Sequence, residues 1–335
     1  MENYEKIKEI RDSFLSFYMM AGYKCVDPAP LIPENDDTIY FSNSAIVPFK
    51  KYLQTDCPRL TVAQKCLRFR GGKNLYDLNE HPYVPYFNMV ASITNAKHCQ
   101  EVAELTQDFL LNSLNIPENK LYADVSSQDP VIIKNFEKYF DLHVDKLEQD
   151  EYRWGFGING VHGRGLCFSM RYGDNKTGDL GQIIQINSDN NKTNYAFGFG
   201  IEKFIKMSEN LDHFYEATSI YEITKDIQGP LAWRYMSSLS SLCYLYSQNI
   251  DFEDPKHKKQ NKIVSSLLHQ VAVVSELMDI PLSKINADAY KFSMVELNKK
   301  TNVDALLRDI NNRKQTTRHD KEFQQISRQL SSKTY

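Results

Sequence analysis

The chain has 335 residues, of which 41% are hydrophobic and 25% are charged, and its formal net charge at pH 7 is −3. These values are ordinary for a globular protein and exclude a disordered chain, and the length allows a large domain with a smaller one. Because no stretch approaches the ~20 apolar residues of a membrane span and the first residues lack a secretory signal, we expect a cytoplasmic protein without a membrane partner.

The first 41 residues predict a helix, a loop and a strand. Residues 4–18 place apolar side chains along one helical face, and Gly22 follows as a stop signal. Residues 26–33 contain three prolines, which exclude a helix. The run at 38–41 is β-branched and aromatic, which indicates a strand.

A hairpin with a long polar tip is predicted next. Residues 64–70 alternate apolar and polar side chains, so Arg68 and Arg70 project from one face of a strand. The glycines and lysine at 71–73 break the strand into a loop. Residues 83–93 are rich in aromatic and β-forming residues and return as the antiparallel partner.

The remaining chain divides by its periodicity. Residues 101–114 have helical spacing, and the glycine-rich stretch 155–200 indicates strands and tight turns. From residue 215 onward the spacing is helical. We therefore expect an α+β fold with one domain over residues 1–212 and a smaller helical domain over residues 213–335.

Three motif blocks occur in a fixed order along the chain. Residues 31–43 read LIPENDDTIYFSN, residues 64–73 and 86–89 read QKCLRFRGGK and YFNM, and residues 198–203 read GFGIEK. These blocks resemble motifs 1, 2 and 3 of class II aminoacyl-tRNA synthetases, and they are most similar to the alanyl-tRNA synthetase core. Trp154 and the glycines up to Gly163 also fit that family. The resemblance covers about residues 5–210 and implies a class II antiparallel sheet flanked by helices, without the family's editing and carboxy-terminal domains.

The resemblance also implies a site for ATP with Mg²⁺. Arg68 matches the motif 2 arginine, whose planar guanidinium would bind the α-phosphate and the acid carboxylate. Phe87 would stack on adenine. Lys203 stands in place of the motif 3 arginine and would act with Arg68 as the second catalytic cation, with a charge but without the planar fork. The expected ATP-binding residues are Arg68, Arg70, Lys73, Phe87, Met89, Gly198, Gly200, Glu202 and Lys203.

The expected acid site departs from the family. Ala196 replaces the aspartate that holds the substrate ammonium, whereas Trp154 keeps a wall of the side-chain pocket. His162 and Arg164 add two candidate cations beside this pocket, suited to a carboxylate or phosphate. Further polar replacements in the same pocket are Asn88, Ser169 and Gln182. The expected substrate-binding residues are Trp154, His162, Ser169, Gln182, Ala196 and Gly198.

Three classes of function remain open. The first is an ATP-dependent ligase that activates a small carboxylic or amino acid and passes the acyl group to an amine, a thiol or a carrier protein. The alternatives are tRNA aminoacylation and a non-catalytic synthetase paralogue that binds a nucleotide or a partner. The motif 1 resemblance implies a homodimer. The cysteines and histidines lack metal-ligand spacing, so we expect no metal site formed by the protein alone.

Overall fold

The computed structural model describes residues 2–33, 36–69, 84–146, 152–229, 231–298, 302–317 and 321–332. Contacts group the chain into two units. The sheet unit comprises Glu5–Cys66 and Phe87–Asp212, and the helical unit comprises Met1–Tyr4, Leu67–Tyr86 and His213–Tyr335. Two residues that we assigned to ATP binding, Arg70 and Lys73, lie outside the described residues.

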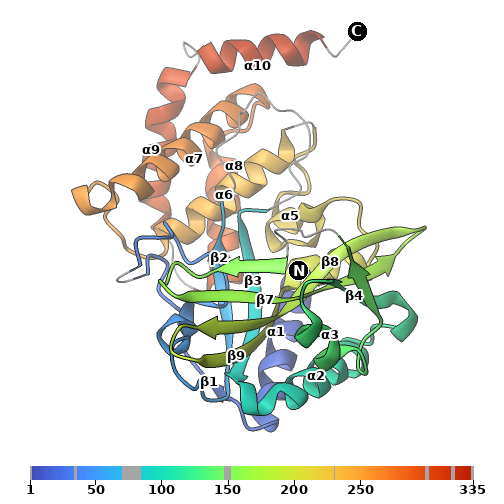
Figure 1. The fold of residues 1–335 in the computed structure, drawn as a ribbon. Helices are drawn as coiled ribbons and strands as arrows, with labels where there is room; N and C mark the ends of the chain where they lie inside the picture. Colours follow the sequence, from blue (N-terminus) through green and yellow to red (C-terminus); the bar gives the residue numbers. More distant parts are fainter. Residues whose placement is uncertain are drawn as a thin grey trace. The chain divides into compact units, whose positions relative to one another are not determined.

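The sheet unit is built on a mostly antiparallel sheet, most strands of which are labelled in Figure 1. The strand order is β1-β2-β3-β9-β8-β7-β4-β5, and β6 also pairs with β7. The pairs from β3 across to β4 are antiparallel, whereas β1 with β2 and β4 with β5 are parallel. This arrangement confirms the expected α+β class. The strands are β1 Lys24–Cys25, β2 Leu60–Leu67, β3 Tyr86–Asn95, β4 Leu121–Ser126, β5 Leu142–Asp145, β6 Arg153–Gly155, β7 Val161–Tyr172, β8 Lys176–Ser188 and β9 Lys192–Gly200.

Strand alternation gives this sheet two faces, which we name after residues of β9. The aromatic face carries Phe197 and Phe199, and the glycine face carries Ala196, Gly198 and Gly200. Helix α1 (Glu2–Met20) packs on the aromatic face, where the Phe14 ring lies 6.2 Å from Phe197 and 5.9 Å from Phe199. The predicted amino-terminal helix is therefore confirmed, and its apolar stripe covers the sheet.

Other helices of this unit also contact aromatic-face residues. The helix predicted over 101–114 is confirmed as α2 (Cys99–Asp108), which continues as a π-helical turn over Phe109–Ser113. The ring of Phe109 lies 6.2 Å from Phe199, and Phe136 of α3 (Pro130–Phe136) lies 6.1 Å from Tyr195. The remaining helix is α4 (Ile201–Ser208), which begins directly after β9.

Residues 38–41 form turns and bends in place of the predicted strand. The Asp36 carboxylate accepts bonds from the backbone N–H of Thr38 at 3.1 Å and from its hydroxyl at 2.5 Å. The Lys50 ammonium donates to the other oxygen of Asp36 at 2.5 Å. The prediction of a strand from β-propensity alone is therefore wrong here, and the bonds of Asp36 to Thr38 hold the start of this segment in a local turn.

We expect Asp36→Asn to lower the free energy of unfolding at pH 7 by about 1 kcal/mol, because it removes a charge-assisted bond. Burial pushes the pKa of Asp36 up, but the bonds from Lys50 and Thr38 outweigh burial and hold the pKa below its usual value. Such a carboxylate stabilises the fold above its unfolded pKa of about 3.9, and this contribution is lost as the pH falls through the folded pKa. Urea unfolding should show a difference between the two proteins that shrinks from pH 7 to pH 3, and a constant difference would contradict this assignment.

The helical unit confirms the helical periodicity after residue 215. Its packing includes two buried carboxylates that accept hydrogen bonds: Glu296 from the Tyr86 hydroxyl at 2.9 Å, and Asp288 from the Tyr235 hydroxyl at 2.9 Å. Its helices are α5 Ser219–Thr224, α6 Ala232–Tyr246, α7 Lys258–Leu277, α8 Leu282–Phe292, α9 Val303–Thr317 and α10 Lys321–Ser332.

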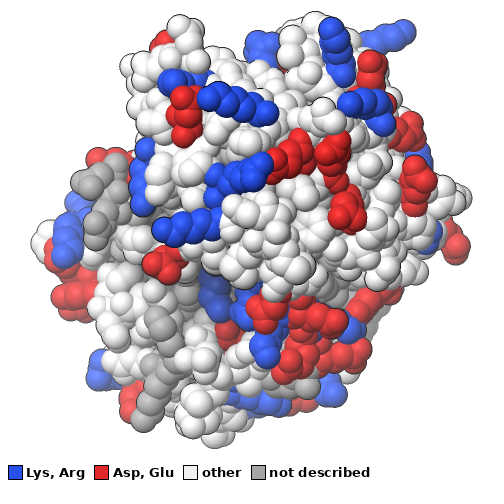
Figure 2. All heavy atoms as spheres, turned by 90° about the horizontal axis from the view of Figure 1, so that it is seen from below, with Lys and Arg blue, Asp and Glu red and all other residues white. Residues whose placement is uncertain are grey.

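The surface carries charges of both signs. On the face drawn in Figure 2, lysines and arginines lie among aspartates and glutamates, in line with the small net charge. None of the described helices combines the length and apolar character needed to cross a membrane.

Candidate active site

On the glycine face, the ring of Phe87 and the aliphatic stem of Lys203 lie beside the same residue, Gly200. A Cβ atom built on Gly200 would lie 3.7 Å from Cγ of Lys203 and 4.0 Å from a ring carbon of Phe87. The Phe87 ring and the Lys203 stem therefore flank Gly200 from two elements, β3 and α4. A flat ring could stack on Phe87 here while Lys203 contacts an attached anion.

Gly198 has a packing role besides the one that the motif implied. A Cβ atom at this position would lie 2.9 Å from the carbonyl oxygen of Val90 and 3.0 Å from Cβ of Ala91. Ala91 is the direct partner of Gly198 in the β3-β9 pair. The close approach of these two strands therefore requires glycine.

Lys203 is held by a carboxylate that the sequence analysis did not single out. Its ammonium forms an ion pair with Asp179 of β8, and both side chains are partly exposed. Asp179 is paired with Ser169 of β7, directly after a bulge that follows Phe168. Since the pair spans 24 residues in the chain, only the strand register brings the two groups together.

A buried carboxylate joins the start of α4 to β3. Glu202, which is 2% exposed, accepts the backbone N–H of Asn88 at 3.0 Å on each oxygen, and it accepts the Asn88 side-chain amide at 2.8 Å. An N–H donor at Asn88 matches the charge of Glu202, whereas a second carboxylate would repel it. This network fixes the segments that carry Phe87 and Lys203.

We expect Asn88→Asp to lower the free energy of unfolding by about 3 kcal/mol at neutral pH, because two buried carboxylates would then face each other. The matched control is the double variant Asn88→Asp with Glu202→Gln, which restores one carboxylate and one amide. Chemical unfolding should show that the double variant regains most of the loss. A double variant no more stable than the single one would contradict a direct interaction.

Ala196 lies in an apolar cluster, and its side chain is buried. It is paired with Ile93 of β3 on one side and with Ile184 of β8 on the other. Phe156 belongs to the same cluster, and Trp154 packs against it. The wall that Ala196 and Trp154 form is therefore apolar, which suits an aliphatic group and offers no counter-charge to an ammonium.

Two further predicted residues lie along the same face. Gln182 of β8 is paired with Gly198 of β9. Ser169 of β7 lies on the same sheet face, and its hydroxyl donates to the Asp124 carboxylate at 3.0 Å. Asp124 was not among the residues predicted for this site. The alternation of apolar and polar residues in Leu121–Ser126 was the signal that could have placed it beside Ser169.

His162 does not lie with the other predicted acid-site residues. His162 is paired with Asn187 of β8, and Ala196 is paired with Ile184 of the same strand. Asn187 and Ile184 are an odd number of residues apart along β8. Because successive strand residues face opposite sides of a sheet, His162 and Arg164 project on the aromatic side. The structure thus separates these two cations from Ala196 and Gly198.

Comparison with known proteins decides the family. A family model described as tRNA synthetases class II (A) matches residues 9–227. The chain belongs to this family. An alanine–tRNA ligase of Idiomarina loihiensis is 32% identical over 168 residues, and one of Wolbachia pipientis is 29% identical over 170 residues. These matches cover 46% and 47% of this chain, but 19% of each relative.

A solved structure of the pyrrolysyl tRNA synthetase PylSc from Desulfitobacterium hafniense is also similar, with a TM-score of 0.41 and 12% identity. The superposition covers 63% of this chain and 72% of that one.

Two residues of the class II motif 2 have distinct surroundings. Met89 is paired with Gly200 and packs against the apolar cluster that contains Ala196. Arg68 belongs to the helical unit, where its backbone N–H donates to the carbonyl of Pro85 at 2.9 Å. The role of Arg68 therefore stays a prediction from the motif, while Met89 lies between Phe87 and the apolar cluster that contains Ala196.

Proposed function

We propose that this chain uses ATP to activate a small acid as its acyl-adenylate. The carrying observation is the placement of Phe87 and Lys203 around Gly200, on the same sheet face as the apolar wall at Ala196. Phe87 stacks on adenine and Lys203 neutralises a phosphate, for which it exchanges Asp179 for the nucleotide. Arg68 takes the phosphate and carboxylate role that motif 2 implies.

Mg²⁺ would supply charge neutralisation at the phosphates. No group of three or more His, Cys, Asp or Glu side chains within the described residues is arranged to hold a metal ion. A nucleotide-borne Mg²⁺ needs only one or two protein carboxylates, because phosphates and water provide its other ligands. Asp179 on the glycine face is a carboxylate that fits this requirement.

The acid should carry a small aliphatic group and no free ammonium at the Ala196 position. A buried ammonium without a counter-charge costs several kcal/mol, which is enough to disfavour alanine by orders of magnitude. The acceptor is then an amine, a thiol or a carrier protein. The chain acts as a cytoplasmic homodimer in this proposal, with motif 1 forming the contact between subunits.

Acid-dependent exchange of pyrophosphate into ATP tests this proposal. The panel should pair each amino acid with its deaminated acid, such as alanine with propionate. We expect exchange with at least one acid lacking a free ammonium, and a loss of about tenfold or more in Lys203→Met that Lys203→Arg restores. No exchange with any acid, together with no heat of ATP binding, would favour the non-catalytic paralogue.

A second candidate is tRNA aminoacylation. It is supported by the similarity to proteins named alanine–tRNA ligase. Measuring the transfer of the activated acid to added tRNA, with the same panel of acids, distinguishes tRNA aminoacylation from transfer to another acceptor. Charging of tRNA with alanine as the best acid would replace our first proposal by this one.

A further inference from the structure

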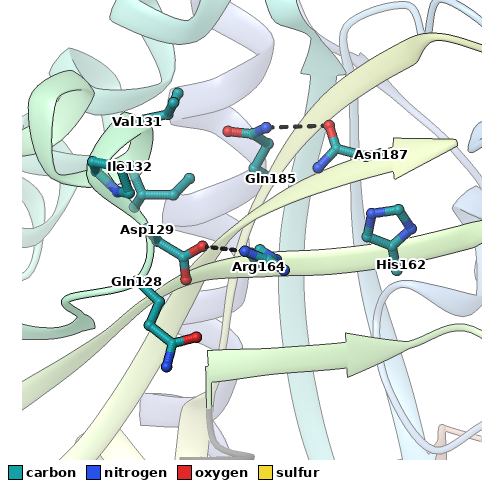
Figure 3. A pocket seen from close by; sticks show the side chains of 9 residues that line it. Gln128, Asp129, Val131, Ile132, His162, Arg164, Gln185 and Asn187 are labelled. Atoms are coloured by element: carbon teal, nitrogen blue, oxygen red, sulfur yellow. Dashed lines mark hydrogen bonds and ion pairs between the residues drawn. The ribbon is translucent and has the colours of Figure 1, made fainter. Parts of the chain in front are cut away.

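A pocket of about 280 Å³ lies on the aromatic side of the sheet, near the amino-terminal ends of α3 and β7 (Figure 3). Its lining includes Asp129, Val131, Ile132, His162, Arg164 and Gln185. We call it the Arg164 pocket. Figure 3 shows strand residues on one side of it and the segment leading into α3 on the other.

The Arg164 pocket is separate from the candidate active site. Arg164 of β7 is paired with Gln185 of β8. The next pair of these strands on the same sheet face is His162 with Asn187. Ala196 is paired with Ile184, whose side chain points through the opposite face. A ligand in this pocket would therefore be separated from the acid site by the thickness of the sheet.

An ion pair forms the centre of the pocket. Nη1 of Arg164 donates to Oδ1 of Asp129 at 2.9 Å, and the Asp129 side chain is only 8% exposed, whereas that of Arg164 is 42% exposed. Among the described residues, neither of these two side chains makes another polar contact. The second oxygen of Asp129 and the other N–H groups of Arg164 can therefore bind a ligand without breaking the pair.

The polar floor of the pocket is held in one orientation. Nε2 of Gln185 donates to Oδ1 of Asn187 at 3.1 Å, as Figure 3 shows. The Tyr195 hydroxyl donates to Oε1 of Gln185 at 2.9 Å. The Thr193 hydroxyl donates to the same oxygen of Asn187 at 2.9 Å. These bonds fix the orientation of both amides, so the Asn187 N–H₂ group can donate to a ligand. His162 also lines the pocket and can bind the same ligand.

The charges decide between ligand classes. A simple anion would meet the Asp129 carboxylate and a simple cation would meet the Arg164 guanidinium, so neither is favoured. A zwitterion matches both groups at once. The apolar side chains of Ile132 and Val131, of which Val131 is 60% exposed, then offer a contact for a short aliphatic group.

We propose that the Arg164 pocket binds a free aliphatic α-amino acid as a zwitterion. The amino acid carboxylate bonds Arg164 and His162, its ammonium bonds the second oxygen of Asp129, and its side chain covers Val131. This binding does not depend on ATP or on the adenylation chemistry proposed above.

Calorimetry on the full chain without ATP tests this proposal with three probes: L-valine, 3-methylbutanoate, which lacks the amine, and isobutylamine, which lacks the carboxylate. We expect valine to bind and both analogues to bind at least about tenfold more weakly. Equal binding of 3-methylbutanoate and valine would overturn the zwitterion assignment, and so would the absence of any valine heat.

Variants locate the bound valine. We expect each of two variants to weaken valine binding about tenfold or more. Arg164→Gln removes the partner of the valine carboxylate, and Val131→Arg obstructs the exposed rim of the pocket. Both positions are partly exposed or more, so both variants should fold. The control Lys192→Gln breaks the exposed Lys192–Asp56 pair elsewhere on the sheet and should bind valine normally. Unchanged affinity in both pocket variants would place the valine elsewhere and overturn the proposal.

Discussion

Ala196→Asp should change which acid the chain activates. An aspartate there would give a substrate ammonium a counter-charge inside the apolar cluster formed by Ile93, Ile184 and Phe156. We expect alanine-dependent pyrophosphate exchange to rise about tenfold or more, and exchange with the preferred acid of the wild type to fall. Without substrate, the buried carboxylate should lower the free energy of unfolding by roughly 3 kcal/mol, and saturating alanine should recover part of it.

The control for this switch is Ala196→Asn, which has nearly the shape of aspartate but no charge. It should be destabilised without any gain for alanine. If wild-type protein already exchanges pyrophosphate best with alanine, another anion must hold the ammonium, and our account of this position is wrong.

Gly165→Ala should destabilise the sheet by about 3 kcal/mol or more. A Cβ atom there would lie 2.0 Å from the carbonyl oxygen of Ile183 and 3.0 Å from Cα of Ile184, its strand partner. These are backbone atoms in the β7-β8 pair, so no side-chain rotation can relieve the overlap. Urea unfolding, or the loss of soluble folded protein, measures the effect.

The matched control is Gly155→Ala in β6. Among the described residues, and apart from the chain neighbours of Gly155, no atom would lie within 4 Å of a Cβ atom built there. We expect this variant to stay within about 0.5 kcal/mol of the wild type or to gain slightly, because alanine restricts the unfolded chain. If Gly165→Ala lowers the free energy of unfolding as little as Gly155→Ala does, then backbone movement relieves the clash at Gly165 and the prediction is wrong.

Periodicity predicted the elements well where burial determines the pattern. The apolar stripe of α1 is of this kind, because it is buried against the sheet, whereas the strands β7 to β9 were indicated by the glycines that separate their short apolar runs. The run 38–41 shows the limit. Its residues favour a strand, but the bonds of Asp36 to Thr38 and Lys50 are specific local interactions that override a weak propensity.

The candidate site was predictable as far as motifs carry it. The motif assigned Phe87, Gly200 and Lys203, and the structure brings these three together. Pairs made across strands were not visible, since the partner of Lys203 depends on the bulge after Phe168. His162 and Arg164 were placed beside the acid site because their glycine-rich segment replaces a segment of the family, but the face on which each side chain lies depends on strand alternation that the motif does not reveal.

The carboxylate of Glu202 has a kinetic consequence. Phe87 directly precedes Asn88, and Lys203 directly follows Glu202, so the bonds between Asn88 and Glu202 hold together the two backbone segments that carry the ring and the cation. The two segments are therefore already in place when a nucleotide arrives, and the side-chain change that our proposal requires is the exchange of Asp179 for the nucleotide by Lys203. The rate of nucleotide binding should therefore be governed by collision, charge attraction and the fast exchange of one partly exposed ion pair, rather than by a slow rearrangement of the backbone that carries the two groups.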